Sequence, residues 1–192
     1  KTMHLLILTP LKLEYQAIRK YLINLQPITK DACNYEVGHF VGKHQTFQIA
    51  IRTTGAKNVT MALATEKAYQ HFKPAVMLLV GVAGGVKDVT IGDVVIANKA
   101  YGYASGKETN EGHQARPNVF PMRPEILAVA ERVDQANQWQ QRLTHKDLQP
   151  TVFFAPIAAD DKVIASSEST SAKILKKHYG DGAYQGNGLW IV

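Results

Sequence analysis

Glu14 is the first residue of this 192-residue chain whose type and position could do chemistry. It lies three residues after Leu11 and four before Ile18, so a helix here would place its carboxylate on the apolar face. A carboxylate at an inward position is costly unless it has a partner or a use, and burial would suit a general base. Glu is also favoured near helix starts, where it complements the helix dipole. The pattern alone leaves the catalytic and the capping interpretations open.

A glycine-rich segment, Gly81-Val82-Ala83-Gly84-Gly85, follows a short apolar stretch. Small residues let the backbone approach a ligand closely and offer free N–H groups. The segment is not a P-loop, because no Gly-Lys-Ser/Thr follows it, and not a dinucleotide fingerprint, because Ala83 occupies the position of the second Gly. Taken alone, it is more typical of a tight turn after a strand than of a ligand site.

Two adjacent carboxylates, Asp160 and Asp161, could bind a cation or a ligand, although such a pair more often forms a turn or a helix cap. The seven His residues have no H-x-x-x-H spacing, and Cys33 is the single cysteine, so we expect no metal site and no disulfide. No G-x-S-x-G sequence occurs, which argues against a serine nucleophile elbow.

The elements that must position these residues alternate between strands and helices. Hydrophobic patterns predict strands over 5–8, 34–41, 46–53, 76–80, 93–103 and 151–158. They predict helices over 11–25, over 58–72, from Pro124 onward, and from Ser166 or Ser167 to about Gly180, with a long loop over 104–122. This alternation is typical of an α/β sandwich, and the hairpin turn at 42–45 makes its sheet mixed. Ligands of such sheets bind beyond the carboxyl ends of the strands.

Composition indicates one soluble globular domain over residues 1–192, because 45% of the residues are hydrophobic and 20% are charged. The net charge of +6 is scattered rather than arranged as a stripe, so we expect no nucleic-acid partner. The longest apolar run, 75–82, is far shorter than the roughly 20 residues that span a bilayer, and no signal peptide is apparent. We therefore expect a cytoplasmic protein without a membrane partner.

Together, several segments resemble the purine nucleoside phosphorylase/nucleosidase superfamily, and within it the methylthioadenosine/S-adenosylhomocysteine nucleosidases. The resemblance covers residues 4–180. It is carried by Leu8-Thr9-Pro10-Leu11-Lys12-Leu13-Glu14, Thr54-Gly55-Ala56-Lys57-Asn58-Val59, Gly81–Gly85 with Ile91-Gly92-Asp93-Val94-Val95, and more weakly by 155–180. It implies a three-layer α/β/α sandwich with a mixed central sheet, hydrolysis of the N-glycosidic bond of adenosyl nucleosides with release of adenine, no cofactor, and a homo-oligomer, commonly a homodimer.

The resemblance also implies roles for residues. Glu14 falls where these nucleosidases keep the carboxylate that activates the attacking water. Val82, Ala83 and Gly84 fall in the loop that faces the ribose and the water, and Val163 and Ile164 fall where the base is held.

Phosphorylases of the superfamily usually place an Arg on the strand before the glycine loop and a Ser within the loop. Here the 76–80 strand carries no charge, and Val82 occupies the Ser position. Water is therefore the favoured nucleophile, with a nucleoside phosphorylase as the alternative.

The segment after Gly180 departs from the family, whose next strand carries a Met-Glu pair and whose later Asp protonates the purine. We accordingly expect a domain that lacks the final strand and helix, with the gap either partly filled by Leu189–Val192 or covered by a partner subunit. We also expect little or no turnover by this chain alone. A non-catalytic module that senses nucleosides is a third possibility.

Overall fold

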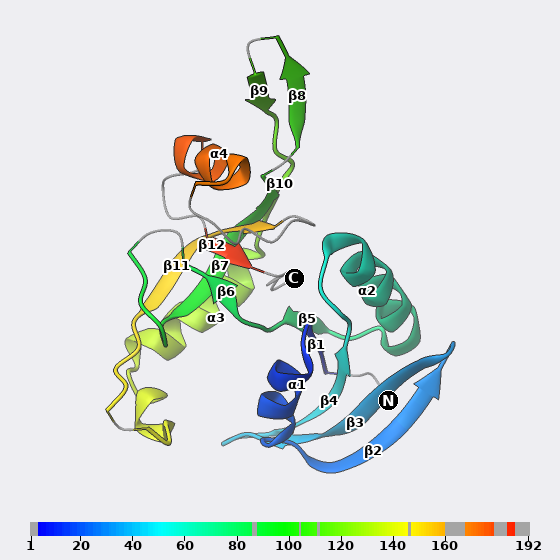
Figure 1. Cartoon of the computed structure of the whole chain (residues 1–192). Coiled ribbons are helices and arrows are strands. Elements are labelled where there is room, and N and C mark those ends of the chain that lie inside the picture. The colour runs from blue at the N-terminus through cyan, green and yellow to red at the C-terminus, as the bar shows by residue number, and fades with distance from the viewer. Residues whose placement is uncertain are drawn as a thin grey trace. The chain divides into compact units, whose positions relative to one another are not determined.

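The described part of the chain carries two five-stranded mixed sheets, each in a unit of its own (Figure 1). The computed structural model describes residues 4–85, 88–103, 105–110, 112–145, 147–159, 168–178 and 184–186. The first unit runs to Val82, and the second extends from Ala83 to Gly186. Helices alternate with strands, and both sheets combine parallel and antiparallel pairs, which confirms the α/β class with mixed pairing.

The sheet of the first unit has the strand order β2-β3-β4-β1-β5. Its strands are β1 (Leu5–Thr9), β2 (Ile23–Lys30), β3 (Cys33–Val41), β4 (Thr46–Thr53) and β5 (Val76–Leu79). The predicted hairpin is confirmed, because β3 and β4 pair antiparallel and the pairing reaches Val41 opposite Thr46. β1 pairs in parallel with both β4 and β5 and so lies inside the sheet.

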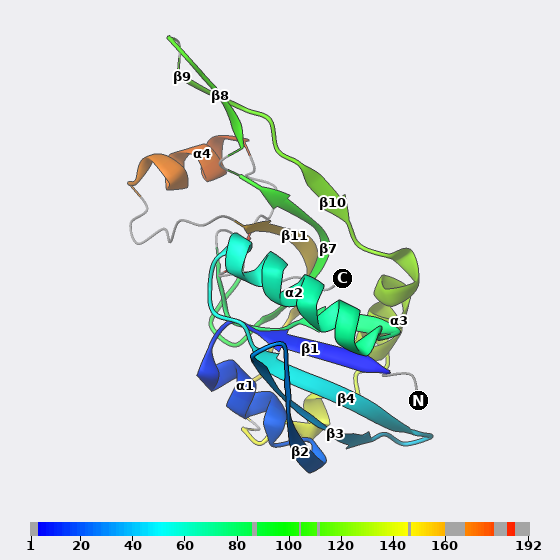
Figure 2. The ribbon, with the colours of Figure 1, turned by 90° about the vertical axis from the view of Figure 1, so that its right-hand side faces the viewer.

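Two helices, α1 (Lys12–Arg19) and α2 (Asn58–Phe72), cover opposite faces of this sheet. Successive residues of a strand point to opposite faces. Leu6 and Leu8 of β1 share a core cluster with Met61 of α2, which runs along β1 (Figure 2). Ile7 belongs to a second cluster, against which Tyr15 of α1 packs. The β1 strand is thus buried on both faces.

The predicted helix over 11–25 is wrong beyond Arg19, because residues from Ile23 onward form strand β2. Pro27 has no backbone N–H to donate in a helix, and it is tolerated on β2 because β2 is an edge strand. Leu22 and Leu25 fit the helical spacing, yet they reach the core beside Ile7 from extended chain.

Helix α2 has the predicted bounds, but two of its larger apolar side chains are exposed. Val59 and Leu63 are exposed at 64% and 62%, whereas Met61, Ala64 and Ala68 are buried. Small alanine side chains let the helix lie close to the sheet, which the larger residues would not allow.

The second unit has a sheet with the order β10-β7-β11-β12-β6 and a separate two-stranded hairpin, β8-β9. Its strands are β6 (Ala83–Gly84), β7 (Val94–Gly102), β8 (Gly106–Thr109), β9 (Gly112–Ala115), β10 (Val119–Pro121), β11 (Val152–Ala159) and β12 (Tyr184–Gly186). Its helices are α3 (Pro124–Gln135), the 3₁₀ turn η1 (Gln140–Arg142) and α4 (Thr170–His178). Among the described residues, no helix combines the length and the apolarity needed to cross a membrane.

Two predictions for the second unit need correction, and one strand was not predicted. The expected loop over 104–122 contains β8, β9 and β10, because Gly112 at φ +108° permits a tight hairpin that its polar composition had concealed. Helix α4 begins at Thr170, later than predicted, and the Ser169 hydroxyl accepts a hydrogen bond from the Ala172 amide. Ser166 and Ser167, the predicted start, lie outside the described residues. Strand β12, which the sequence analysis did not predict, lies between β11 and β6.

Candidate active site

Three segments of the first unit leave its sheet at one edge. The parallel register places Thr9 of β1 opposite Thr53 of β4, and Leu8 opposite Leu79 of β5. The Thr9 carbonyl accepts hydrogen bonds from both the amide (2.9 Å) and the hydroxyl (3.2 Å) of Thr54, which ties two of the strand ends together. The segments that follow β1, β4 and β5 therefore begin side by side, as expected for a ligand site of an α/β sheet.

Glu14 is the one buried residue of α1, with 7% of its surface exposed. Its Oε2 accepts a hydrogen bond from the Leu11 amide at 2.7 Å, and its Oε1 accepts one from the Val82 amide at 2.8 Å. The first bond caps the start of the helix, and the second reaches the chain that leaves β5. The predicted inward orientation is confirmed, and the capping interpretation describes only half of the contacts.

Gly81 lets the carboxylate and the chain after β5 approach this closely. A Cβ atom at this position would lie 2.8 Å from Glu14 Oε1 and 3.1 Å from Pro10 Cδ. Contacts this short force a neighbour to move, so the absence of a side chain at Gly81 is part of how Glu14 is seated.

The two amide donors leave the Glu14 carboxylate able to accept further hydrogen bonds. An ionised carboxylate accepts at about two sites on each oxygen, and here each oxygen receives one backbone N–H among the described contacts. The remaining sites can accept a hydrogen bond from a water molecule or a hydroxyl group. A seated carboxylate with spare acceptor sites is suited to orient a water molecule and to take its proton.

The other predicted site residues are distributed differently. Val82 ends the first unit with its side chain 67% exposed, and Ala83 and Gly84 form β6 in the second unit. Val163 and Ile164 lie outside the described residues. The pair of carboxylates at 160–161 also lies outside them. Across the described ranges, no three His, Cys, Asp or Glu side chains gather as ligands for a metal ion.

A cluster beside Glu14 received no role in the sequence analysis. The Tyr15 hydroxyl donates a hydrogen bond to Glu36 Oε2, and Arg19 donates from Nε at 2.8 Å and from Nη2 at 3.0 Å to the two oxygens of Glu36. The Arg19 guanidinium lowers the pKa of Glu36, whereas burial, followed by the neighbouring Glu36, raises the pKa of Tyr15 to about 12. The i, i+4 spacing of Tyr15 and Arg19 indicates that they share a helix face, but it does not point to Glu36 as their partner.

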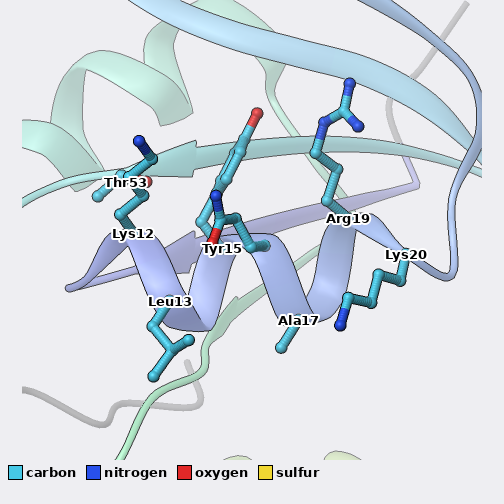
Figure 3. Close-up of a pocket in the computed structure, with 8 residues that line it drawn as sticks. Lys12, Leu13, Tyr15, Ala17, Arg19, Lys20 and Thr53 are labelled. Atoms are coloured by element: carbon cyan, nitrogen blue, oxygen red, sulfur yellow. The ribbon is translucent and has the colours of Figure 1, made fainter.

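A pocket of about 690 Å³ lies along α1, lined by α1 side chains together with Thr53 (Figure 3). Leu13 on its wall is 73% exposed, so the pocket is a shallow surface feature. Glu14 is absent from its lining, and we do not assign the chemistry to it.

Two curated relatives are 5′-methylthioadenosine/S-adenosylhomocysteine nucleosidases. The protein from Actinobacillus succinogenes is 28% identical over 124 residues, which are 58% of this chain and 52% of that protein. The protein from Aeromonas salmonicida is 25% identical over 135 residues, 65% of this chain and 55% of that protein. This chain therefore spans about half the length of the curated relatives it matches.

The fold is shared with solved structures. A nucleosidase of the same description from Colwellia psychrerythraea, in complex with adenine, superposes with a TM-score of 0.76 at 17% identity, covering 96% of this chain and 72% of that one. The family model of the phosphorylase superfamily matches residues 4–182, nearly the whole chain. The chain thus belongs to the phosphorylase superfamily.

Proposed function

We propose that this chain hydrolyses the N-glycosidic bond of adenosyl nucleosides of the methylthioadenosine/S-adenosylhomocysteine type and releases adenine. The observation that carries the proposal is the seat of Glu14, a buried carboxylate held by two backbone amides at the carboxyl edge of the parallel strands. The names of the curated relatives and of the superposed structure support the substrate class.

In this proposal Glu14 is the general base. A water molecule adds its oxygen to C1′ of the ribose, and its proton passes to the Glu14 carboxylate. The C1′–N9 bond breaks, its electron pair leaves with the purine, and the purine takes up a proton from the solvent. Because the transition state resembles a ribosyl oxocarbenium ion, the water needs only modest activation, and orientation by Glu14 is its main requirement.

Five further residues complete the proposed site. Val82, Ala83 and Gly84 would face the ribose and the water, and Val163 and Ile164 would hold the base. The Val82 amide already donates a hydrogen bond to Glu14, so the backbone of this loop is linked directly to the proposed general base.

Water rather than phosphate is the proposed nucleophile. Strand β5 carries only Val, Met and Leu, so a phosphate dianion would find no charged partner on it. Val82 has no hydroxyl group to donate to a phosphate oxygen.

The direct test is adenine release from methylthioadenosine in phosphate-free buffer. Glu14→Gln removes the general base. Glu66→Gln is the matched control, because it neutralises an exposed carboxylate of α2 whose hydrogen bond is to the neighbouring Gln70. We expect slow release by the wild-type chain and by Glu66→Gln, because the segment after Gly180 departs from the family, and loss of this release with Glu14→Gln.

Other outcomes identify the alternatives. Release that requires added phosphate and yields a ribose phosphate would identify a phosphorylase. Tight nucleoside binding without release would identify a sensing module, and retention of full activity by Glu14→Gln would contradict the role given to Glu14.

We further propose that the protein is cytoplasmic and forms a homodimer. The exposed apolar side chains of α2, Val59 and Leu63, offer a surface that a second copy could cover. Light scattering of the purified protein tests the oligomeric state, and a monomer at micromolar concentration would contradict it.

A further inference from the structure

Helix α1 has weak apolar anchoring for an element that carries the proposed base. It is eight residues long, and its one buried side chain is the Glu14 carboxylate. Leu13 is 73% exposed, while Tyr15 and Ile18 are only partly buried against the sheet. Short helices depend on tertiary contacts for their stability, so the polar contacts of α1 carry much of its positioning.

Those polar contacts converge on one residue of β3, and we call Tyr15, Arg19 and Glu36 the Glu36 clamp. Glu36 accepts from the Tyr15 hydroxyl on one oxygen and from the Arg19 guanidinium on both. The Glu36 side chain is 18% exposed, so water competes less for it than for an ion pair in open solvent. Tyr15 and Arg19 rise from the same side of the helix, while Leu13 and Ala17 point the other way (Figure 3).

The clamp fixes the rotation of α1 about its own axis, which determines where the Glu14 carboxylate lies. Tyr15 directly follows Glu14, and Arg19 lies about one turn after Tyr15, so all three residues move together when the short helix rotates. A rotation of roughly 10° moves an atom about 6 Å from the helix axis by about 1 Å. Such a movement would break the 2.8 Å contact between Glu14 Oε1 and the Val82 amide.

We propose that Tyr15, Arg19 and Glu36 are positioning residues, which hold α1 in the rotation that keeps the Glu14 carboxylate against the Val82 amide. The kinetic consequence rests on the proposed function, whereas the geometric consequence does not. In the described residues, the side-chain hydrogen bonds of the clamp join Tyr15 and Arg19 to Glu36 and do not reach Glu14 or Val82, so loss of the clamp affects the placement of the Glu14 carboxylate.

The geometric consequence is measured by amide hydrogen exchange in the full chain. The Val82 amide donates to Glu14, and the nearby Val80 amide donates to the Leu8 carbonyl at 3.0 Å, so Val80 is an internal reference that does not involve α1. In Arg19→Gln we expect exchange at Val82 to rise about tenfold, as for loss of a hydrogen bond to a charged group, with Val80 unchanged.

Two further variants make the test specific. Lys20→Gln removes one positive charge from the same end of α1 at an exposed position outside the clamp, and should leave both amides unchanged. Tyr15→Phe removes only the hydroxyl and keeps the ring in the core, so it should raise Val82 exchange even if Arg19→Gln folds poorly. Unchanged exchange at Val82 in both clamp variants, even with a lowered Tm, would overturn the proposal.

Steady-state kinetics on methylthioadenosine give the second readout. We expect kcat to fall about tenfold in Arg19→Gln and Tyr15→Phe while KM changes less than about threefold, because placement of the base affects the chemical step. Equal kcat per folded molecule in the clamp variants and Lys20→Gln would overturn a positioning role in catalysis. If the wild-type chain releases no adenine, the proposed function fails, and the exchange experiment still decides whether the clamp positions Glu14.

Discussion

Adding a single methyl group at Gly81 should displace the Glu14 carboxylate while leaving its chemical identity unchanged. In Gly81→Ala the new Cβ would lie 2.8 Å from Glu14 Oε1, whereas ordinary van der Waals contact begins at 3.4 Å. The difference of 0.6 Å is the retreat required if the carboxylate alone yields. A misplacement of about 1 Å can cost about 100-fold in rate, so a shift of about half that size predicts a roughly tenfold fall in kcat. That factor corresponds to about 1.4 kcal/mol of transition-state stabilisation.

The assay compares this variant with a glycine substitution that is equally crowded but remote from the proposed base. In Gly42→Ala the new Cβ would lie 2.9 Å from the Gln45 carbonyl oxygen in the β3–β4 turn. Both variants should lose about 1–3 kcal/mol of stability through overpacking. Only Gly81→Ala should lose kcat when adenine release is normalised to folded protein. Full kcat in Gly81→Ala, or an equal loss in Gly42→Ala, would refute the reasoning.

The remaining predictions concern stability, each measured as Tm. Lys57 has φ +86° and ψ 145°, a region open essentially only to glycine, so Lys57→Gly should raise the stability by about 1 kcal/mol and Tm by about 2–4 °C. The backbone amides of Thr90 and then Thr151 lower the pKa of Asp93, so its contribution to folding stability is present above pH 3.8 and lost below it. Asp93→Asn should therefore lower Tm at pH 7, and the difference in Tm from the wild-type chain should shrink toward pH 3. Burial raises the pKa of Tyr15 from 10.0 to about 12, so its contribution to folding stability is present below pH 10 and lost toward pH 12. Tyr15→Phe should therefore lose less Tm than the wild-type chain between pH 10 and pH 12, and an identical loss would contradict the assignment.

Hydrophobic patterns predicted most of the fold because most of its elements are buried on a regular period. Strand β1 and helix α2 have the predicted positions, since a run of Leu and Ile and a stop at Pro74 leave few alternatives. The start of strand β2 was missed because Leu22 and Leu25 also fit a helical spacing, and only pairing with β3 decides between the two. Pairing likewise determines the β8–β9 hairpin, whose residues are polar and carry no periodic signal.

The candidate site was harder to predict because its contacts join distant parts of the chain. Glu14 could be recognised as an inward carboxylate, but its partner at Val82 lies 68 residues away. The Glu36 clamp escaped notice for the same reason: Glu36 lies 17 residues beyond Arg19 and on a strand, so no local pattern links them. Local spacing identifies Glu14 as the residue that interrupts the apolar pattern. Its hydrogen-bond partner, the Val82 amide, comes close only through the parallel pairing of β1 and β5.

Glu14 and Gly81 therefore form one unit, and this coupling is itself testable. Burial of the Glu14 carboxylate costs less free energy because the Val82 amide donates a hydrogen bond to it. The amide comes this close only because Gly81 has no side chain. If Gly81→Ala acts solely by moving the base, it should cost almost nothing more in kcat once Glu14→Gln has removed that base. A double-mutant cycle measures this directly. Multiplicative losses in the double variant would show that Gly81 contributes to the reaction through contacts other than its contact with Glu14.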